Sequence, residues 1–461
     1  MLRSERRVVI TGLGLISPLG IGPTPLWAGL ASGHGAVRPI EAFAIAGLPC
    51  HAGAEVLGFD PKILALPKHR KTLTKSLKYM ARDIQLAVAA AELAIADAGL
   101  ADGGVDPTRI GVDLGAGLIS SELDELAPSI NLATRDDGSF DFATYGKDGI
   151  PSITPIWLLK YLPNMLACHI SILSDCQGPS NSITEAEAAS NIAIGEAARI
   201  IARGRADVMV TGGADSKIHP LSLVRMTLLE QLSRWDGDPH AACRPFDRQR
   251  SGWVPGEGAG ILILEEREHA LKRGARIIGE VLGYGCGCDA YPAGGLDPEG
   301  AGTEVALKAA IRDAGLEPAQ IGHVNAHGAG SVKMDLAEAR ALNRVFGPAG
   351  VPVTSLKGYM GNIVSGAGAV ELAASLLGVN QGRIPSTLNC DDPDPECGLD
   401  IVRGEPRPTT NPIFLNTNLT RHGQAAALVI QGQPAPADYS SSSLDEAREE
   451  ASMVAHLIHK G

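Results

Sequence analysis

Two side chains that could do chemistry lie where a folded chain often presents reactive groups. Glu187 begins an alanine-rich segment in which Ala189, Ala193 and Ala197 recur at helical spacing, so its carboxylate would lie at the positive end of a helix dipole. His327, in the sequence NAHGAG, follows a short apolar run at an expected strand-to-loop edge. Taken singly, each residue also has a structural interpretation, as a first-turn glutamate and as a buried core histidine.

The eight cysteines are scattered without a framework spacing, which favours reduced thiols. Cys286 and Cys288 form a C-x-C pair, but no other cysteine pair or histidine stands near enough to complete four ligands, so we predict no metal site. Cys176 is an alternative nucleophile in the same region as Glu187. It precedes the turn at Gly178 and would miss the helix dipole, which favours a buried structural thiol.

Composition excludes several classes of function. The net charge is −12 and no segment alternates Lys or Arg with aromatic residues, so we predict no nucleic-acid partner. The apolar run after the charged N-terminus is too short for a signal sequence or a membrane span, which predicts a cytoplasmic protein without a membrane partner. A G-x-G follows the first expected strand, but Ser17 stands where a dinucleotide fingerprint has its third glycine, so no nucleotide cofactor is expected.

The elements that must position these residues belong to an α/β fold. Hydrophobic residues make up 44% of the chain and aromatic residues 4%, and β-branched runs such as Val8–Ile10 and Val208–Val210 alternate with helical patterns. The sequence at 91–100 (AELAIADAGL) recurs at 307–316 (LKAAIRDAGL), and each copy is followed by a turn and Ile-Gly. Two related halves are therefore predicted, with a seam near Glu265 and an active site between them.

These patterns divide the chain into residues 1–265, residues 266–432 and a tail at 433–461. Within the first half, periodicity breaks over 120–163, which we interpret as an insertion or a partner-contact segment. The tail reads as a linker followed by an amphipathic helix with a capping box at Ser443 and Glu446. It could dock on the protein's own surface or bind a partner.

Four sequence blocks occur in the order found in one enzyme family. They are RRVVITGLGLISPLG, CRPFDRQRSGWVPGEGAGILILEE, VNAHGAGSVKMDLAEA and SLKGYMGNIVSGAGAVE. Across about residues 6–432 the chain resembles the β-ketoacyl-acyl-carrier-protein synthases, in particular the elongating type II branch. The resemblance implies a duplicated thiolase-like fold with α/β/α/β/α layers. It also implies a dimer and substrates carried on the phosphopantetheine of acyl carrier protein, without a cofactor of the chain's own.

The resemblance also assigns roles. Family members use a cysteine thiolate at a helix start to accept an acyl group, and two histidines to support decarboxylation and stabilise the enolate. Here Glu187 stands at the cysteine position. His327 matches the first histidine, and Asn362 replaces the second. Asn362 can donate a hydrogen bond but cannot titrate.

Further matched residues surround this position. Lys357 and Glu371 correspond to a buried ion pair beside the site, for which a structural role is at least as well supported as a catalytic one. Asp335 and Glu338 are expected to anchor the loop that carries His327.

The family's C-terminal loop carries two phenylalanines and paired glycines. Here it reads NTNLTRHGQAA from Asn416. Asn418, Thr420 and Arg421 are therefore the substrate-tunnel or oxyanion-loop candidates, with Thr420 at the gating phenylalanine and Arg421 at a glycine. These changes predict restricted passage of an acyl chain.

Together these features predict a non-condensing subunit of fatty-acid or polyketide biosynthesis that resembles a chain-length factor. It would form a heterodimer with a cysteine-containing ketosynthase, or otherwise a homodimer. One alternative is a malonyl-carrier decarboxylase in which Glu187 imitates a charged acyl-enzyme and His327 supports the enolate. Residual 3-oxoacyl synthase activity is a further alternative. The basic cluster at 67–83 could contact the acidic carrier protein, or form a solvated helix face.

Overall fold

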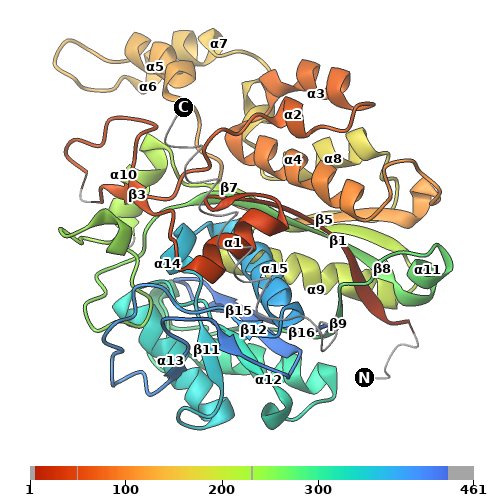
Figure 1. Ribbon diagram of the computed structural model, residues 1–461. Coiled ribbons are helices and arrows are strands. Elements are labelled where there is room, and N and C mark those ends of the chain that lie inside the picture. Colours follow the sequence, from red (N-terminus) through yellow and green to blue (C-terminus); the bar gives the residue numbers. More distant parts are fainter. Residues whose placement is uncertain (1–5, 49, 230–231, 434–461) are drawn as a thin grey trace.

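The computed structural model describes residues 6–48, 50–229 and 232–433, and its helices cover and separate the strands of a large mixed sheet (Figure 1). The strands of residues 8–266 adjoin in the order β6-β5-β7-β8-β1, and those of residues 279–432 in the order β13-β11-β10-β15-β16-β9. β1 and β9 join the two sets through register pairs from Val8↔Val281 to Ile10↔Gly279. The strands of the first set are β1 (Val8–Ser17), β5 (Ile110–Ala116), β6 (Ser180–Ile183), β7 (Val208–Ser216) and β8 (Glu257–Glu266). Those of the second set are β9 (Gly279–Cys288), β10 (His323–Asn325), β11 (Pro352–Thr354), β13 (Asp400–Ile401), β15 (Ile413–Leu419) and β16 (Gln424–Gly432).

The two sets of strands share one topology, which confirms the predicted duplication. In each set the first strand lies beside the last, and both pair antiparallel. The repeated sequences lie in α4 (Arg82–Asp97), which packs on β1, and in α12 (Ala301–Ala314), which packs on β9. Both contacts need glycine on the strand, because a Cβ at Gly14 would lie 1.8 Å from the Ala90 carbonyl oxygen and one at Gly285 would lie 2.3 Å from that of Ala306.

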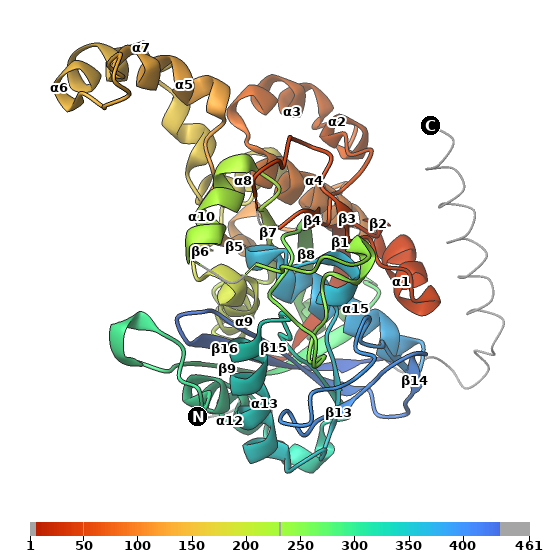
Figure 2. The same cartoon turned by 90° about the vertical axis from the view of Figure 1, so that its left-hand side faces the viewer.

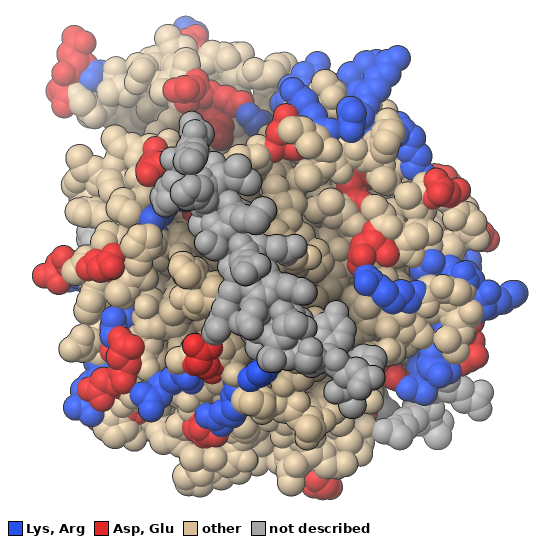
Figure 3. Space-filling model, viewed as in Figure 1, with Lys and Arg blue, Asp and Glu red and all other residues tan. Residues whose placement is uncertain are grey.

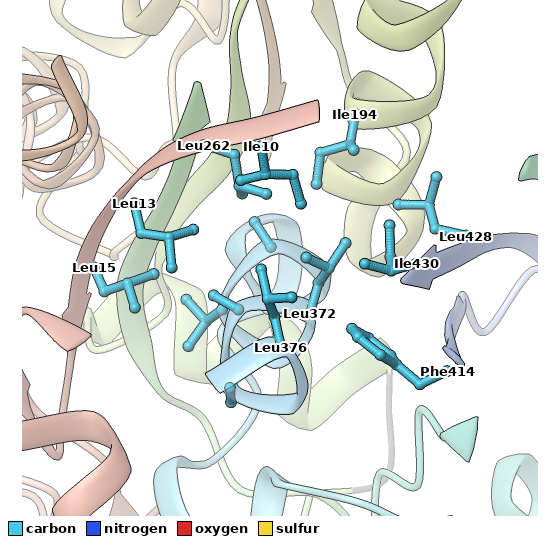
Figure 4. Packing of buried hydrophobic residues seen from close by; sticks show 14 of the residues in the cluster. Ile10, Leu13, Leu15, Ile194, Leu262, Leu372, Leu376, Phe414, Leu428 and Ile430 are labelled. Carbon is cyan, nitrogen blue, oxygen red and sulfur yellow. The ribbon is translucent and has the colours of Figure 1, made fainter. Parts of the chain in front are cut away.

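The helices form the predicted α/β/α/β/α order. Together with α8 (Met165–Ser174), α4 covers one outer face, and α12 with α13 (Val332–Phe346) covers the other. Two buried helices, α9 (Ala189–Ala202) and α15 (Ala367–Asn380), lie between the two sets of strands. Figure 4 shows the resulting core, in which Leu372 and Leu376 of α15 meet residues of both sets, among them Ile10, Leu262 and Leu428. The first residues of both helices, Ala189 and Ala367, are buried as well.

The predicted strands at 8–10 and 208–210 are confirmed as parts of β1 and β7. Segment 120–163 forms an arm of short helices, α5 (Leu123–Leu132), α6 (Phe142–Thr144) and α7 (Ile150–Ser152), that extends away from the sheet in Figure 2. Its status as an insertion stays a prediction, as does the seam near Glu265. The predicted tail helix lies outside the described residues.

Other elements complete the fold. They are β2 (Gly20–Ile21), α1 (Pro23–Ser32), β3 (Arg38–Pro39), β4 (Ala52–Gly53), α2 (Pro61–Leu64), α3 (Arg70–Ser76), α10 (Pro220–Leu229), α11 (Arg267–Lys272), α14 (Lys357–Met360), β12 (Arg383–Ile384) and β14 (Arg407–Pro408). No helix in the described part of the chain is long and apolar enough to cross a bilayer.

Candidate active site

Glu187 lies where the sequence predicts it, at the tip of the central helix α9. It is the middle residue of a 3-10 turn, η5 (Ala186–Ala188), that leads directly into α9. Ala186 has a left-handed φ of 41°, which bends the chain sharply before the helix. The Glu187 side chain is 6% exposed, so the carboxylate is enclosed in the protein. The predicted helix over the alanine repeat is confirmed.

Asn362 holds the Glu187 carboxylate. Its Nδ2 donates to Glu187 Oε1 at 3.2 Å, and its Oδ1 accepts from the Val364 backbone N–H at 3.0 Å. Because the Val364 N–H can only donate, the amide nitrogen of Asn362 must face Glu187. The backbone of Asn362 is fixed as well, since it bonds to Val254 and Gly256. The residue at the second histidine position is therefore a fixed, non-titrating donor to the acid.

His327 lies in a second, fully buried group with Lys357, Glu371 and Asn418. Lys357 Nζ donates to the His327 carbonyl oxygen at 2.7 Å and to Glu371 Oε1 at 2.6 Å. Asn418 Nδ2 donates to Glu371 Oε2 at 2.8 Å and lies 3.4 Å from His327 Nδ1. Burial raises the pKa of Glu371, although the donors Lys357 and Asn418 act to lower it. The predicted ion pair between Lys357 and Glu371 is present, and each carboxylate oxygen of Glu371 accepts one hydrogen bond.

These contacts determine the state of the His327 ring. Asn191 Nδ2 donates to Asn418 Oδ1 at 2.8 Å, so the Asn418 amide nitrogen faces both Glu371 and His327. His327 Nδ1 must then accept, which leaves the proton on Nε2. Burial, and secondarily the charge of Lys357, lowers the pKa of His327 well below its usual value. His327 is a neutral imidazole, and its Nε2 has no hydrogen-bond partner within the described residues.

Two buried acids anchor the loop that carries His327, as predicted. Glu338 accepts the backbone N–H groups of His327 at 2.7 Å and Gly328 at 2.8 Å, and Asp335 accepts that of Ala329 at 2.9 Å. Burial raises the pKa of Glu338 to about 8 and that of Asp335 to about 6. Both acids act on backbone groups, so they position the loop rather than contact a substrate.

Three of the candidate segments meet in one apolar cluster. Ala186, next to Glu187, packs with Val364, two residues after Asn362, and with Ala329, two residues after His327. The structure therefore brings the helix tip, the asparagine loop and the histidine loop together. Sequence reasoning missed Asn191 and its partner Asn416, which link α9 to β15. A polar residue one turn after Glu187 on a buried helix face was the available signal.

The C-terminal loop is shorter than predicted. Asn416 and Asn418 lie in β15, because the strand pairs with β16 up to Leu419, and only residues 420–423 form the turn. Thr420 is 2% exposed and closes the turn with Gln424, its N–H donating at 2.8 Å. Two side chains fasten the turn to neighbouring segments.

The side chains of Arg421 and His422 hold the turn through two hydrogen bonds, which we call its fastenings. Arg421 Nη1 donates to the Leu229 carbonyl oxygen, at the end of α10, at 2.8 Å. His422 Nδ1 donates to the carbonyl oxygen of Gly294 at 2.6 Å. We call residues 420–423 with these two fastenings the strap. The strap therefore holds on two sides a turn that, from the sequence, is predicted only as an altered loop.

The other nucleophile candidate is inert. Cys176 follows α8, and burial with the nearby Asp175 charge raises the pKa of its thiol to about 12. Thiolates, not thiols, attack thioesters. No group of three His, Cys, Asp or Glu side chains that could hold a metal ion occurs in the described ranges.

The layered fold and the buried helix-tip site define a class of protein, and comparison with known proteins identifies it. The β-ketoacyl synthase N-terminal domain matches residues 5–270 and the β-ketoacyl synthase C-terminal domain matches residues 278–391. The chain is 34% identical to a 3-oxoacyl-[acyl-carrier-protein] synthase 2 of Synechocystis sp., over 93% of this chain and 98% of that protein.

Two solved structures are also similar to this chain over most of its length. The ishigamide ketosynthase/chain length factor matches with a TM-score of 0.80 and 31% identity, over 93% of this chain and 99% of that one. A type II polyketide-synthase acyl-carrier protein in complex with its ketosynthase bound to the hexaketide matches with a TM-score of 0.79 and 27% identity, over 93% and 99%. The chain belongs to the β-ketoacyl synthase family, whose relatives serve fatty-acid and polyketide biosynthesis.

Proposed function

We propose that this chain is a non-condensing subunit that pairs with a cysteine-bearing ketosynthase, in the manner of a chain-length factor. The observation that carries the proposal is the Glu187 carboxylate at the tip of α9, buried and bonded to Asn362. An acyl group moved from a thioester to a carboxylate forms a mixed anhydride, which is uphill, whereas transfer between thiols is near neutral. Each ~1.4 kcal/mol of that difference costs about tenfold in rate.

The surroundings of Glu187 support the same conclusion. Asn362 cannot accept or release a proton, so it cannot do the acid–base work of a second histidine. The strap also replaces the glycine-rich loop, and its fastenings to Leu229 and Gly294 oppose the movement that would admit an acyl chain. Three separate requirements for condensation are altered, and their losses compound.

A partner surface is available on the described part of the chain. β6 is the terminal strand of its set and pairs only with β5, so its other edge offers unpaired backbone groups. Large apolar side chains are also exposed elsewhere in the first half of the chain, among them Phe142 of the arm at 82% and Leu228 of α10 at 79%. An open strand edge and exposed apolar surface are each typical of a protein interface. A ketosynthase of the same family would offer a matching edge.

The acyl carrier protein would bind at a separate surface. We call Lys68, Arg70, Lys71, Lys75 and Lys78 the basic surface; all five are exposed on and around α3. Figure 3 shows Lys and Arg side chains gathered at the upper right, where Figure 1 places α3. An acidic carrier would be steered there even though the net charge of the chain is −12.

Co-expression with a cysteine-bearing ketosynthase of the same family tests the proposal. We expect native mass spectrometry to find a one-to-one complex, and acyl-carrier treatment to add mass only to the ketosynthase. Glu187→Gln should leave product formation by the complex within about twofold, as should the control Glu185→Gln next to the turn. An acyl adduct on this chain, or a stable homodimer that ignores the ketosynthase, would overturn it.

One observation favours a second function, malonyl-carrier decarboxylation. His327 is neutral and its Nε2–H has no partner within the described residues, so it could donate to an enolate oxygen. Carbon dioxide release from malonyl-carrier protein should then be abolished by His327→Ala and retained in Cys176→Ala. Absence of release by the purified complex would eliminate this function.

A further inference from the structure

The segment that carries the basic surface has positive charge without acids to neutralise it. Residues 61–80 contain six Lys or Arg side chains and no Asp or Glu. The five cations of the basic surface are exposed, and none of them forms an ion pair within the described residues. Exposed cations on α12 and α13 differ, because Lys308 pairs with Glu304 and Arg340 pairs with Glu299. The basic surface therefore attracts an acidic segment.

Apolar side chains are exposed next to these cations. Ile63 of α2 is 73% exposed, and Leu57, four residues before α2 begins, is 47% exposed. α2 packs against α3, so Ile63 and the cations of α3 belong to one face of the molecule. Apolar side chains beside a group of cations match an amphipathic helix that carries acids beside its apolar stripe.

The chain beyond the described residues contains a segment of this kind. We call residues 444–458 the acidic segment; they form the greater part of the helix predicted from the sequence. Residues 444–454 contain four carboxylates and one arginine, which gives them a net charge of −3. The apolar residues recur at helical spacing and would form one stripe. They are Leu444, Ala447, Ala451, Val454 and Ile458.

The acidic segment is tethered by enough chain to reach the basic surface. Strand β16 ends at Gly432, which pairs with Gly279 of β9. Figure 1 shows β16 in the lower half of the molecule and α3 at its upper edge. The ten residues 434–443 can extend to about 35 Å, and a helix over 444–458 adds about 22 Å. A compact chain of this size has a radius of gyration of about 22 Å, so the acidic segment can cross one face of the molecule.

We propose that the acidic segment docks on the basic surface of its own chain and that an acyl carrier protein must displace it in order to bind. Its carboxylates lie toward the cations of α3, and its apolar stripe packs on Ile63 and Leu57. The displacement rests on the proposed function, which places the carrier protein on the same surface. A tethered segment has an effective concentration in the millimolar range, so a weak contact suffices to cover the surface when no carrier is present.

Carbodiimide crosslinking of the full-length chain, followed by peptide mapping, tests the docking. This reagent joins a carboxylate directly to an amine that contacts it. The pair of Lys308 with Glu304, at 2.6 Å, is the internal positive control. We expect the carboxylates of 445–450 to be joined to lysines of residues 61–80. Mixing light and heavy isotope-labelled chains separates links within one chain from links between two copies.

Three results would overturn the docking while the control pair is linked. They are links from the acidic segment to lysines outside 61–80, links to 61–80 only between two copies, and no links from the acidic segment at all. The second result would mean that a neighbouring copy, and not the same chain, occupies the basic surface.

Calorimetric titration with apo acyl carrier protein measures the displacement. Glu449→Gln with Glu450→Gln removes two charges from the acidic segment without adding a positive charge that would itself attract the carrier. We expect the carrier's dissociation constant to fall about 3-fold, the change when coverage of the surface falls from about four fifths to about two fifths. Asp236→Asn with Glu396→Gln removes two exposed charges elsewhere and is the matched control, which should change the constant less than about twofold.

The outcomes distinguish the docking from the proposed carrier surface. If the crosslinks to 61–80 are absent and Lys71→Glu still weakens carrier binding, the docking is wrong and the carrier surface stands. If the crosslinks are present but neither Lys71→Glu nor the two Gln changes alter carrier binding, the carrier surface fails and the docking stands. If the crosslinks are present and only Lys71→Glu alters carrier binding, the displacement is wrong.

Discussion

Replacing Lys357 with Met would measure what the buried ion pair contributes to this fold. Lys357 is fully buried, and its ammonium bonds to Glu371 and to the His327 carbonyl oxygen. The variant leaves the Glu371 carboxylate with Asn418 as its remaining side-chain donor. Breaking a buried pair by removing one partner costs about 3–5 kcal/mol. We expect Lys357→Met to lose that much free energy of unfolding.

The double variant Lys357→Met with Glu371→Gln measures how much of that loss comes from the unpaired charge of Glu371. Both charges are then gone, Gln can still accept from Asn418, and the remaining defect is the His327 carbonyl without its donor, about 1–3 kcal/mol. The double variant should therefore be about 2 kcal/mol more stable than Lys357→Met. Urea unfolding followed by tryptophan fluorescence, with reversibility checked by refolding, gives the three free energies.

The loss of stability in Lys357→Met should depend on pH, and the direction follows from the pKa of Glu371. Burial raises the pKa of Glu371, and loss of the ammonium raises it further in Lys357→Met. The folded variant then takes up a proton as pH falls, so its deficit should be smaller at pH 5 than at pH 8. A double variant no more stable than Lys357→Met would refute this reasoning, because the cost of Lys357→Met would then not come from the unpaired Glu371 charge.

Three further predictions concern separate parts of the molecule. Arg421→Ala removes one fastening of the strap and should speed hydrogen exchange in the 420–423 turn about 10-fold, the value of one charged hydrogen bond; unchanged exchange would mean that Arg421 does not hold it. Burial, with the nearby Glu196 charge, raises the pKa of Asp113 from 3.8 to about 7, so wild-type stability falls as pH rises through that interval. Asp113→Asn should remove up to about 4 kcal/mol of this fall, at about 1.4 kcal/mol per pKa unit, and parallel urea midpoints from pH 4 to 8 would contradict it. Lys71→Glu on the basic surface should weaken carrier binding and flatten its salt dependence, whereas Lys308→Glu on α12 should not.

Local sequence determined the family and the altered residues. The four matched blocks are short runs whose residue types can be recognised without a fold. The replacement at 362 lies inside one of them, and the replacement at 187 lies between the first and the second, at the start of the alanine-rich segment. The repeat at 91–100 and 307–316 predicted the duplication, because related helices must pack on related strands. The helix after Glu187 followed from alanine spacing alone. Each of these inferences uses residues that are neighbours along the chain.

Only the tertiary structure decided how the site is connected. Asn362 reaches Glu187 across 175 positions, and Asn191 fixes the Asn418 amide across 227. Arg421 is fastened to Leu229 across 192 positions. Contacts between such distant positions depend on the order of the strands in the sheet and on the packing of the helices. Residue types alone do not specify that arrangement. The state of the His327 ring and the strap both follow from that packing, because each depends on which polar groups the fold brings together.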